Sequence, residues 1–125
     1  MMILAAFFSG GQAATAQEVI DTYIADIGYE DLHNSSGVRL TTAGAILQQD
    51  RANVHKYNIR HPRDTKDNYF TTAAERAEIS HAVAVSNLPK GLTDAIVRGT
   101  VRPLRIEIYW FDESGVDYFE ITPAD

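Results

Sequence analysis

The sequence predicts an α+β fold in which three to four helices pack on a small antiparallel sheet, built around a C-terminal β-hairpin over residues 104–121. Apolar and polar residues alternate from Leu104 to Ile108, which is the period of a half-buried strand. The helix start and stop signals all lie earlier in the chain. Helices followed by paired strands indicate an α+β arrangement rather than a doubly wound fold.

The hairpin residues also predict a strand register. Residues 112–115 form a four-residue loop in which Gly115 can take a positive φ. A three-residue loop would place Ile108 opposite Glu120 and mix apolar with charged side chains, so the longer loop is preferred. The resulting facing pairs are Tyr109 with Tyr118, Ile108 with Phe119, Glu107 with Glu120 and Ile106 with Ile121.

Both faces of this hairpin are apolar enough to require a covering. One face carries Ile106, Ile108, Trp110, Phe119 and Ile121, and the other carries Tyr109, Phe111, Val116 and Tyr118. Either helices cover both faces, or the aromatic face meets a partner. In the second case Tyr109, Phe111 and Tyr118 are the binding residues, with Glu107 and Glu120 as a charged rim.

Two helices are predicted before residue 60. Residues 17–27 carry apolar side chains at helical spacing, and Gly28 is a natural stop. Thr41 or Thr42 can cap a second helix that runs to about Tyr57. Residues 38–40 between the two helices can form a short strand.

Two further helices are predicted after a loop over residues 60–68. Thr72 and Glu75 form a capping box that opens a helix to about Val85, although alternation from Ile79 leaves a strand there possible. Pro89 opens a short helix through residue 97, and Gly99 ends it.

Composition limits the function classes. The formal net charge is −6 and the isoelectric point is about 5.1, which argues against non-specific electrostatic binding of nucleic acid. Residues 18–31 hold five acids and no base, whereas residues 51–66 hold five bases, so the two stretches can face one another. The chain has no cysteine, and thiolate metal sites and disulfides are therefore excluded.

Residues 1–16 resemble a secretory signal, leaving residues 17–125 as a single domain. An apolar run over residues 3–8 precedes small residues ending at Ala16, the pattern that a signal peptidase accepts. The run is too short for a membrane-spanning helix. A periplasmic or secreted location follows, and the alternative is a cytoplasmic protein in which residues 3–8 form a buried strand.

The densest group of chemically active side chains lies in residues 55–67. His55, His61 and Asp64 are candidates for acid–base chemistry, since Asp64 can orient His61. Arg60 and Arg63 can bind a phosphate or a carboxylate. The spacing of the two histidines matches no metal motif, and solvated surface loops often have this composition.

These observations predict a small exported acidic module that acts by binding, with another protein as the expected partner. The sequence holds no nucleotide-binding or hydrolase motif, so neither a cofactor nor a metal is predicted, and an enzyme is less favoured. Two alternatives remain: a small hydrolytic or phosphate-handling enzyme using residues 55–67, and a cytosolic acidic partner of a basic protein.

Overall fold

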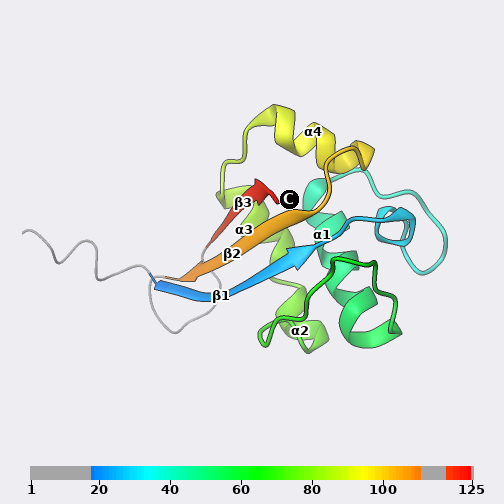
Figure 1. The fold of residues 1–125 in the computed structure, drawn as a ribbon, viewed down its shortest axis with the longest axis horizontal. Coiled ribbons are helices and arrows are strands. Elements are labelled where there is room, and N and C mark those ends of the chain that lie inside the picture. The colour runs from blue at the N-terminus through cyan, green and yellow to red at the C-terminus, as the bar shows by residue number, and fades with distance from the viewer. Residues whose placement is uncertain (1–17, 111–117, 125) are drawn as a thin grey trace, which may run out of the picture.

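A three-stranded antiparallel sheet with helices on one side forms the protein. The computed structural model describes residues 18–110 and 118–124. The strands are β1 (Glu18–Ala25), β2 (Leu104–Trp110) and β3 (Tyr118–Pro123), in the order β1-β2-β3 (Figure 1). The helical elements are η3 (Tyr29–Leu32), α1 (Ala43–Ala52), η4 (Asn53–Tyr57), α2 (Ala73–Arg76), α3 (Ile79–Val85) and α4 (Lys90–Arg98). The predicted α+β class is confirmed.

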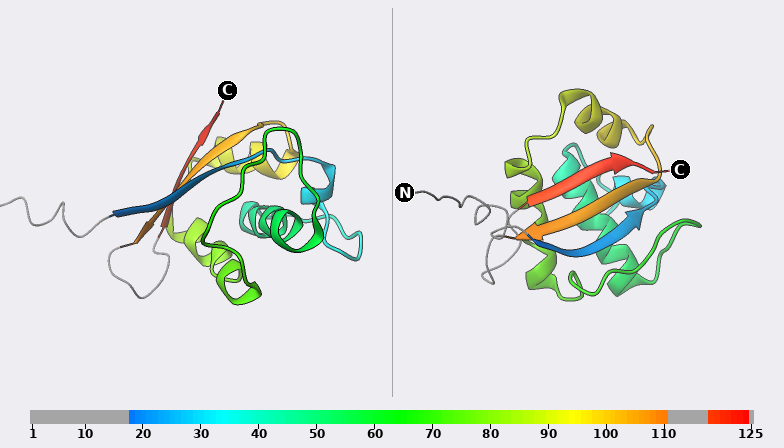
Figure 2. Two further views of the ribbon diagram at one scale, coloured as in Figure 1. Left: turned by 60° about the horizontal axis from the view of Figure 1, so that its bottom comes forward. Right: turned by 60° about the vertical axis from the view of Figure 1, so that its left-hand side comes forward.

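The register predicted for the hairpin is confirmed. Tyr109 pairs with Tyr118, Ile108 with Phe119, Glu107 with Glu120 and Ile106 with Ile121. One face of the hairpin is buried under the helices, because Ile106, Ile108 and Phe119 are at most 1% exposed. Figure 2 shows the helices on that side of the sheet only. The predicted loop at residues 112–115, together with Phe111 and Val116, lies outside the described residues, as does the predicted signal at residues 1–16.

The helix predicted for residues 17–27 is wrong, because Glu18–Ala25 form strand β1. The apolar residues there fit helical spacing, but several are β-branched and favour a pleated strand. Tyr23 and Ala25 are buried on one face, and Tyr23 lies opposite Ile106 of β2. A two-stranded hairpin is marginally stable alone, and β1 adds a third strand to the sheet.

The second helix begins where predicted. Thr42 is its N-cap, and its Oγ1 accepts a hydrogen bond of 3.2 Å from the Ala45 N–H. The helix α1 ends at Ala52 and continues as one π-helical segment, η4, which stops at Asn58 with φ +58°. The strand expected at residues 38–40 is only an isolated bridge between His33 and Arg39.

The later helices are close to those predicted. Thr72 and Glu75 form the capping box, but the helix breaks into a single turn, α2, followed by α3. The strand alternative at Ile79 is wrong, because Ile79 and Ala82 bury one helical face. Pro89 is the N-cap of α4, and Gly99 ends that helix with φ +71°.

The core lies between the sheet and the helices. Phe70 is fully buried and contacts the rings of Tyr23 and Phe119 edge-on, with centroids 6.3 and 5.9 Å away. The segment that leads to Phe70 runs beside β1, where the Thr65 N–H donates to the Ile24 carbonyl and Thr65 Oγ1 accepts from the Ile24 N–H. On β3, the Phe119 N–H donates to Ser86 Oγ at 2.7 Å.

Candidate functional site

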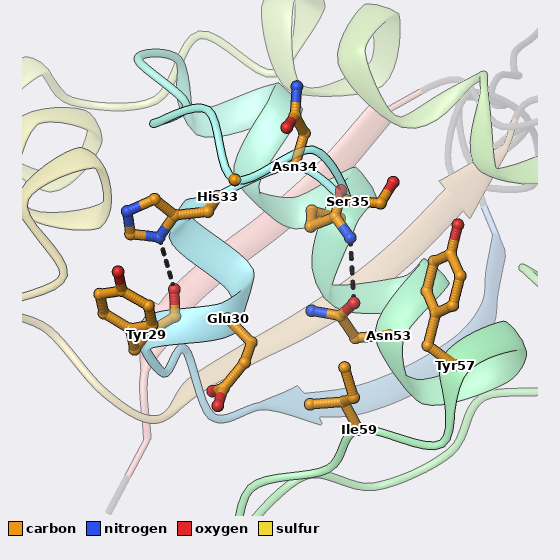
Figure 3. Close-up of a pocket in the computed structure, with 10 residues that line it drawn as sticks. Tyr29, Glu30, His33, Asn34, Ser35, Asn53, Tyr57 and Ile59 are labelled. Carbon is orange, nitrogen blue, oxygen red and sulfur yellow. Dashed lines mark hydrogen bonds between the residues drawn. The ribbon is translucent and has the colours of Figure 1, made fainter.

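A pocket of about 450 Å³ opens between η3 with its following turn and the end of α1 with η4 (Figure 3). Tyr29 and Tyr57 lie on opposite sides of it, and Asn53 lies between them. Its volume falls in the range of pockets that bind small molecules. The lining residues are Tyr29, Glu30, His33, Asn34, Ser35, Gly37, Gln49, Asn53, Tyr57 and Ile59.

One wall of the pocket is made by the π-helical segment η4. The Asn53 carbonyl accepts from the N–H groups of both Asn58 and Ile59, which closes the segment. Asn58 then takes a left-handed conformation that is uncommon outside glycine. These features place Asn53, Tyr57 and Ile59 around the same opening. Segments of π-helix occur often at functional sites, so η4 marks this wall as the place to look for function.

The opposite wall is fixed by its own hydrogen bonds. Asn34 Oδ1 accepts from the N–H groups of Ser36 and Val38, each at 2.9 Å, and Gly37 has φ +82°. The His33 ring packs against Tyr29 with centroids 4.3 Å apart and an interplanar angle of 33°, and its Nδ1 lies 3.0 Å from the Tyr29 carbonyl oxygen. The turn therefore holds its shape without help from a ligand.

The floor of the pocket is a buried chain of polar groups. Asn53 is 2% exposed, and its Nδ2 donates to Asp31 Oδ1 at 2.8 Å. Asn53 Oδ1 accepts from Gln49 Nε2 at 3.0 Å. Burial raises the pKa of Asp31, against hydrogen bonds from Gly28 and Asn53 that lower it. A buried polar floor that is hydrogen-bonded in this way is rigid.

Glu30 connects the pocket to His61 behind it. Glu30 Oε1 lies 2.8 Å from His61 Nε2, and the Glu30 side chain is half exposed. His61 Nδ1 lies 3.3 Å from Asp31 Oδ2 and 3.5 Å from Asp64 Oδ2. Partial burial opposes the charged imidazole, but the Glu30 hydrogen bond and the nearby Asp31 and Asp64 charges outweigh it and raise the pKa of His61. The same hydrogen bond lowers the pKa of Glu30.

Behind His61, one fully buried guanidinium joins several carboxylates. Arg51 lies 2.7 Å from Asp50, 2.8 Å from Asp67 and 3.9 Å from Asp64. Its guanidinium carbon is 4.0 Å from the centroid of the Tyr23 ring. Burial raises the pKa of Asp50 well above its usual range, although the Arg51 charge opposes this. We call Asp50, Arg51, Asp64 and Asp67 the ion network.

The residues proposed for acid–base chemistry separate into two groups. His61 and Asp64 do come together, and Arg60 Nη2 donates to the Asp64 carbonyl at 2.8 Å. His55 Nε2 lies instead 2.7 Å from Asp67 Oδ1. Burial alone would raise the pKa of Asp67. Hydrogen bonds from the Phe70 N–H, His55 and Arg51 outweigh burial, so the pKa lies below its usual value.

Arg63, one of the two arginines proposed to bind an anion, is engaged with a buried acid. Arg63 Nη2 lies 3.2 Å from Asp26 Oδ1, where Arg102 Nε also donates, at 2.7 Å. Burial disfavours the charged Asp26, yet hydrogen bonds from Arg102 and Arg63 hold its pKa below the usual value. The basic stretch and the acidic stretch of the chain thus contact each other through Arg63 and Asp26, and through His61 and Glu30.

Tyr109 and Tyr118 lie on the face of the sheet opposite to the helices, because each alternates with a residue, Ile108 or Phe119, that is buried under them. Figure 2 shows the described helices on one side of the sheet. Tyr109 and Tyr118 are half-buried and stack with ring centroids 4.9 Å apart and an interplanar angle of 6°. Phe111, the third residue proposed for binding, lies outside the described residues. Two of the three proposed residues therefore form one patch on the sheet.

Sequence reasoning missed the pocket. No pattern in the sequence predicts the π-helical segment, and from the sequence alone Asn53 is only a residue of low helix propensity. Glu30 and Gln49 read as ordinary surface residues. The one available signal was charge, since the acidic stretch containing Glu30 and the basic stretch containing His61 were expected to face one another.

No protein-family model matches the chain, and no curated protein or solved structure is detectably similar to it. Among residues 18–110 and 118–124, no helix is long and apolar enough to cross a membrane. In the same part of the chain, no three histidine or acidic side chains are grouped so as to hold a metal ion.

Proposed function

We propose that this protein is an exported acidic module that binds a small polar molecule in the pocket between η3 and η4. The observation that carries the proposal is the built floor of the pocket, where Asn53 is locked between Asp31 and Gln49. Buried polar groups that are already satisfied hold the remaining lining groups in place before a ligand arrives. Preorganisation of this kind lowers the cost of binding.

Binding fits the site better than catalysis. A general base acts best when its pKa lies near the working pH, but Glu30 has a lowered pKa and is paired with His61. The nitrogens of His61 face the carboxylates of Glu30, Asp31 and Asp64, which stabilise the imidazolium instead of leaving a free base. An enzyme using His61 and Asp64 is therefore the less supported hypothesis.

The proposal is tested by mapping where small molecules bind. Amide chemical shifts of labelled protein are recorded against a set of small fragments that includes neutral, cationic and anionic compounds. We expect the largest shifts in residues 29–37 and 49–59. Hits that cluster on β2 and β3, or no hits at all, would contradict the proposal.

A pair of neighbouring serines provides the control. Ser35 lines the pocket, whereas Ser36 is an exposed neighbour outside the lining. Ser35→Trp should fill the opening and abolish the fragment shifts, whereas Ser36→Trp should leave them unchanged. Equal effects of the two substitutions would place the binding site elsewhere.

A second candidate function is protein binding through the open face of the sheet. It is favoured by the stacked pair of Tyr109 and Tyr118 on the face that the described helices leave uncovered. Aromatic side chains with a polar end are enriched in protein interfaces. Export itself rests on the predicted signal, and the N-terminal residue of the native protein tests it.

A further inference from the structure

We infer that the ligand of the pocket is an uncharged, polyhydroxylated molecule of about the size of a single sugar ring. This inference rests on the proposed function and specifies the ligand class. Three features support it: the charges of the lining residues, the side chains that already contact the two tyrosine rings, and the hydrogen bonds that orient the side-chain amides.

An anionic ligand is disfavoured by the charges that line the pocket. The ten lining residues within the described chain include no lysine and no arginine. Glu30 is the acidic residue among them, and its carboxylate is negative. An anion would leave water to lie beside that carboxylate, and the Lys56 ammonium over the Tyr57 ring is exposed to solvent, so it offers only a screened counter-charge.

A cationic ligand finds no free aromatic cage. The His33 ring, tilted by 33°, packs against one side of the Tyr29 ring. Lys56 Nζ already lies over the Tyr57 ring, 5.3 Å from its centroid, and would repel a second cation. The Glu30 carboxylate is paired with His61 at 2.8 Å. Recognition of an ammonium group by aromatic faces needs rings that are open to it.

The remaining lining groups are neutral, and a relay of hydrogen bonds fixes their direction. Asp31 accepts from the Asn53 amide nitrogen, so the Asn53 oxygen must face Gln49. One of the two N–H groups of the Gln49 amide makes that contact, which fixes the amide plane and leaves the Gln49 carbonyl oxygen as an acceptor. The buried carboxylate thus orients a side chain two hydrogen bonds away.

Donors complement this acceptor on the opposite wall. The Asn34 oxygen is occupied by two backbone N–H groups, so its amide nitrogen is the group left to donate. The hydroxyls of Ser35 on that wall and of Tyr57 on η4 also line the pocket, and a hydroxyl can either donate or accept. A ligand hydroxyl also donates and accepts, and several hydroxyls on one small ring match this mixed lining.

The inference is tested with three sugars that share one ring but differ in charge: neutral, cationic and anionic. Shifts of the Gln49 side-chain amide and of residues 33–37 are followed while glucose, glucosamine and glucuronate are titrated into the full chain at neutral pH. We expect glucose to bind, glucuronate to bind at least tenfold more weakly, and glucosamine to bind no more tightly than glucose. Tighter binding of either charged ring overturns the ligand class but leaves the proposed function standing.

A negative result is also decisive. If no ring shifts the pocket resonances while neutral fragments without hydroxyls do, the ligand class is wrong and the pocket still binds small molecules. If neither shifts them, both the inference and the proposed function fail.

Two glutamines test the role of the relay. Gln49→Met removes the oriented acceptor but keeps the side-chain length, and we expect glucose affinity to fall about three- to tenfold, the usual loss for one hydrogen bond. Gln48→Met is the control, since Gln48 contacts Ser80 and does not line the pocket. Ser35→Ala is a second, exposed probe that avoids disturbing the floor. Unchanged affinity in both Gln49→Met and Ser35→Ala would overturn the inference.

Discussion

The two halves of this small fold are held by different forces. Under the sheet, Ile106, Ile108 and Phe119 pack against Phe70 and the helices as an ordinary apolar core. Beyond the end of β1, the chain is held by the ion network and by His61 with its carboxylates. Apolar packing depends little on pH, whereas buried charges respond to it. The pocket lies on the ionic half, so we expect its shape and its affinity for a ligand to depend on pH.

The largest effect should come from removing the guanidinium of the ion network. Arg51→Met leaves Asp67 and Asp50 buried without their counter-charge, and we expect a loss of about 3–5 kcal/mol in the free energy of unfolding. The loss should shrink as the pH falls, because protonated carboxylates no longer need Arg51. Urea denaturation at two pH values measures both effects.

Ile108→Val is the matched change in the apolar half. It should cost about 0.5–1.5 kcal/mol, and the cost should be the same at both pH values. If both variants showed the same dependence on pH, the contrast between the two halves would be mistaken.

Two glycines offer a test of how tightly His61 is held. A Cβ on Gly28 would lie 2.2 Å from His61 Nε2, so Gly28→Ala should displace the imidazole and cost about 1–3 kcal/mol. Gly91 in α4 has nothing within 4 Å of such a Cβ, and Gly91→Ala should instead stabilise the helix by up to about 1 kcal/mol. Melting temperatures of the two variants should therefore move in opposite directions.

The open face of the sheet should tolerate change. Tyr109→Ser loses a stacked ring pair worth about 0.5–1.5 kcal/mol, far less than the loss expected for Arg51→Met. A pull-down from native extract is the second measurement. Weaker capture with a nearly unchanged melting temperature supports a binding face, whereas a large fall in melting temperature makes the tyrosines part of the core.

The smallest effect concerns the titration of His61. Because its folded-state pKa is raised, the stability it contributes is fully present below about pH 6.5, the ordinary histidine value, and is lost as the pH rises through the folded-state pKa. NMR titration of the ring should give a midpoint above 6.5. Glu30→Gln should lower that midpoint, and Glu120→Gln on the open face should not. Identical midpoints in both variants would remove Glu30 as the cause.

The apolar half was largely predictable from the sequence, and the reason is local. The register of the hairpin follows from alternation between Leu104 and Ile108, and helix ends follow from Thr42, Thr72 and Gly99. β1 was missed because its partner, β2, is about eighty residues away, so the alternation of Tyr23 and Ala25 was indistinguishable from a helical pattern.

The ionic half was not predictable because its character comes from long-range contacts. Asp64 and Asp67 lie in a stretch whose composition is typical of a solvated loop, yet both are buried beside Arg51. Only their distant partners make such burial possible. The pairing of His61 with Asp64 was anticipated, but the connection of His61 to Glu30 and the pocket was not.

The hydrogen bonds along the outer strands have a consequence for assembly. Thr65 occupies both backbone groups of Ile24 at one margin of the sheet, and Ser86 takes the N–H of Phe119 at the other, close to Pro123, which has none to offer. Neither margin offers a continuous ladder to an incoming strand, so fibril-like growth and strand addition are both discouraged. A strand that approached either margin would therefore meet backbone groups at Ile24 or Phe119 that are already hydrogen-bonded within the domain.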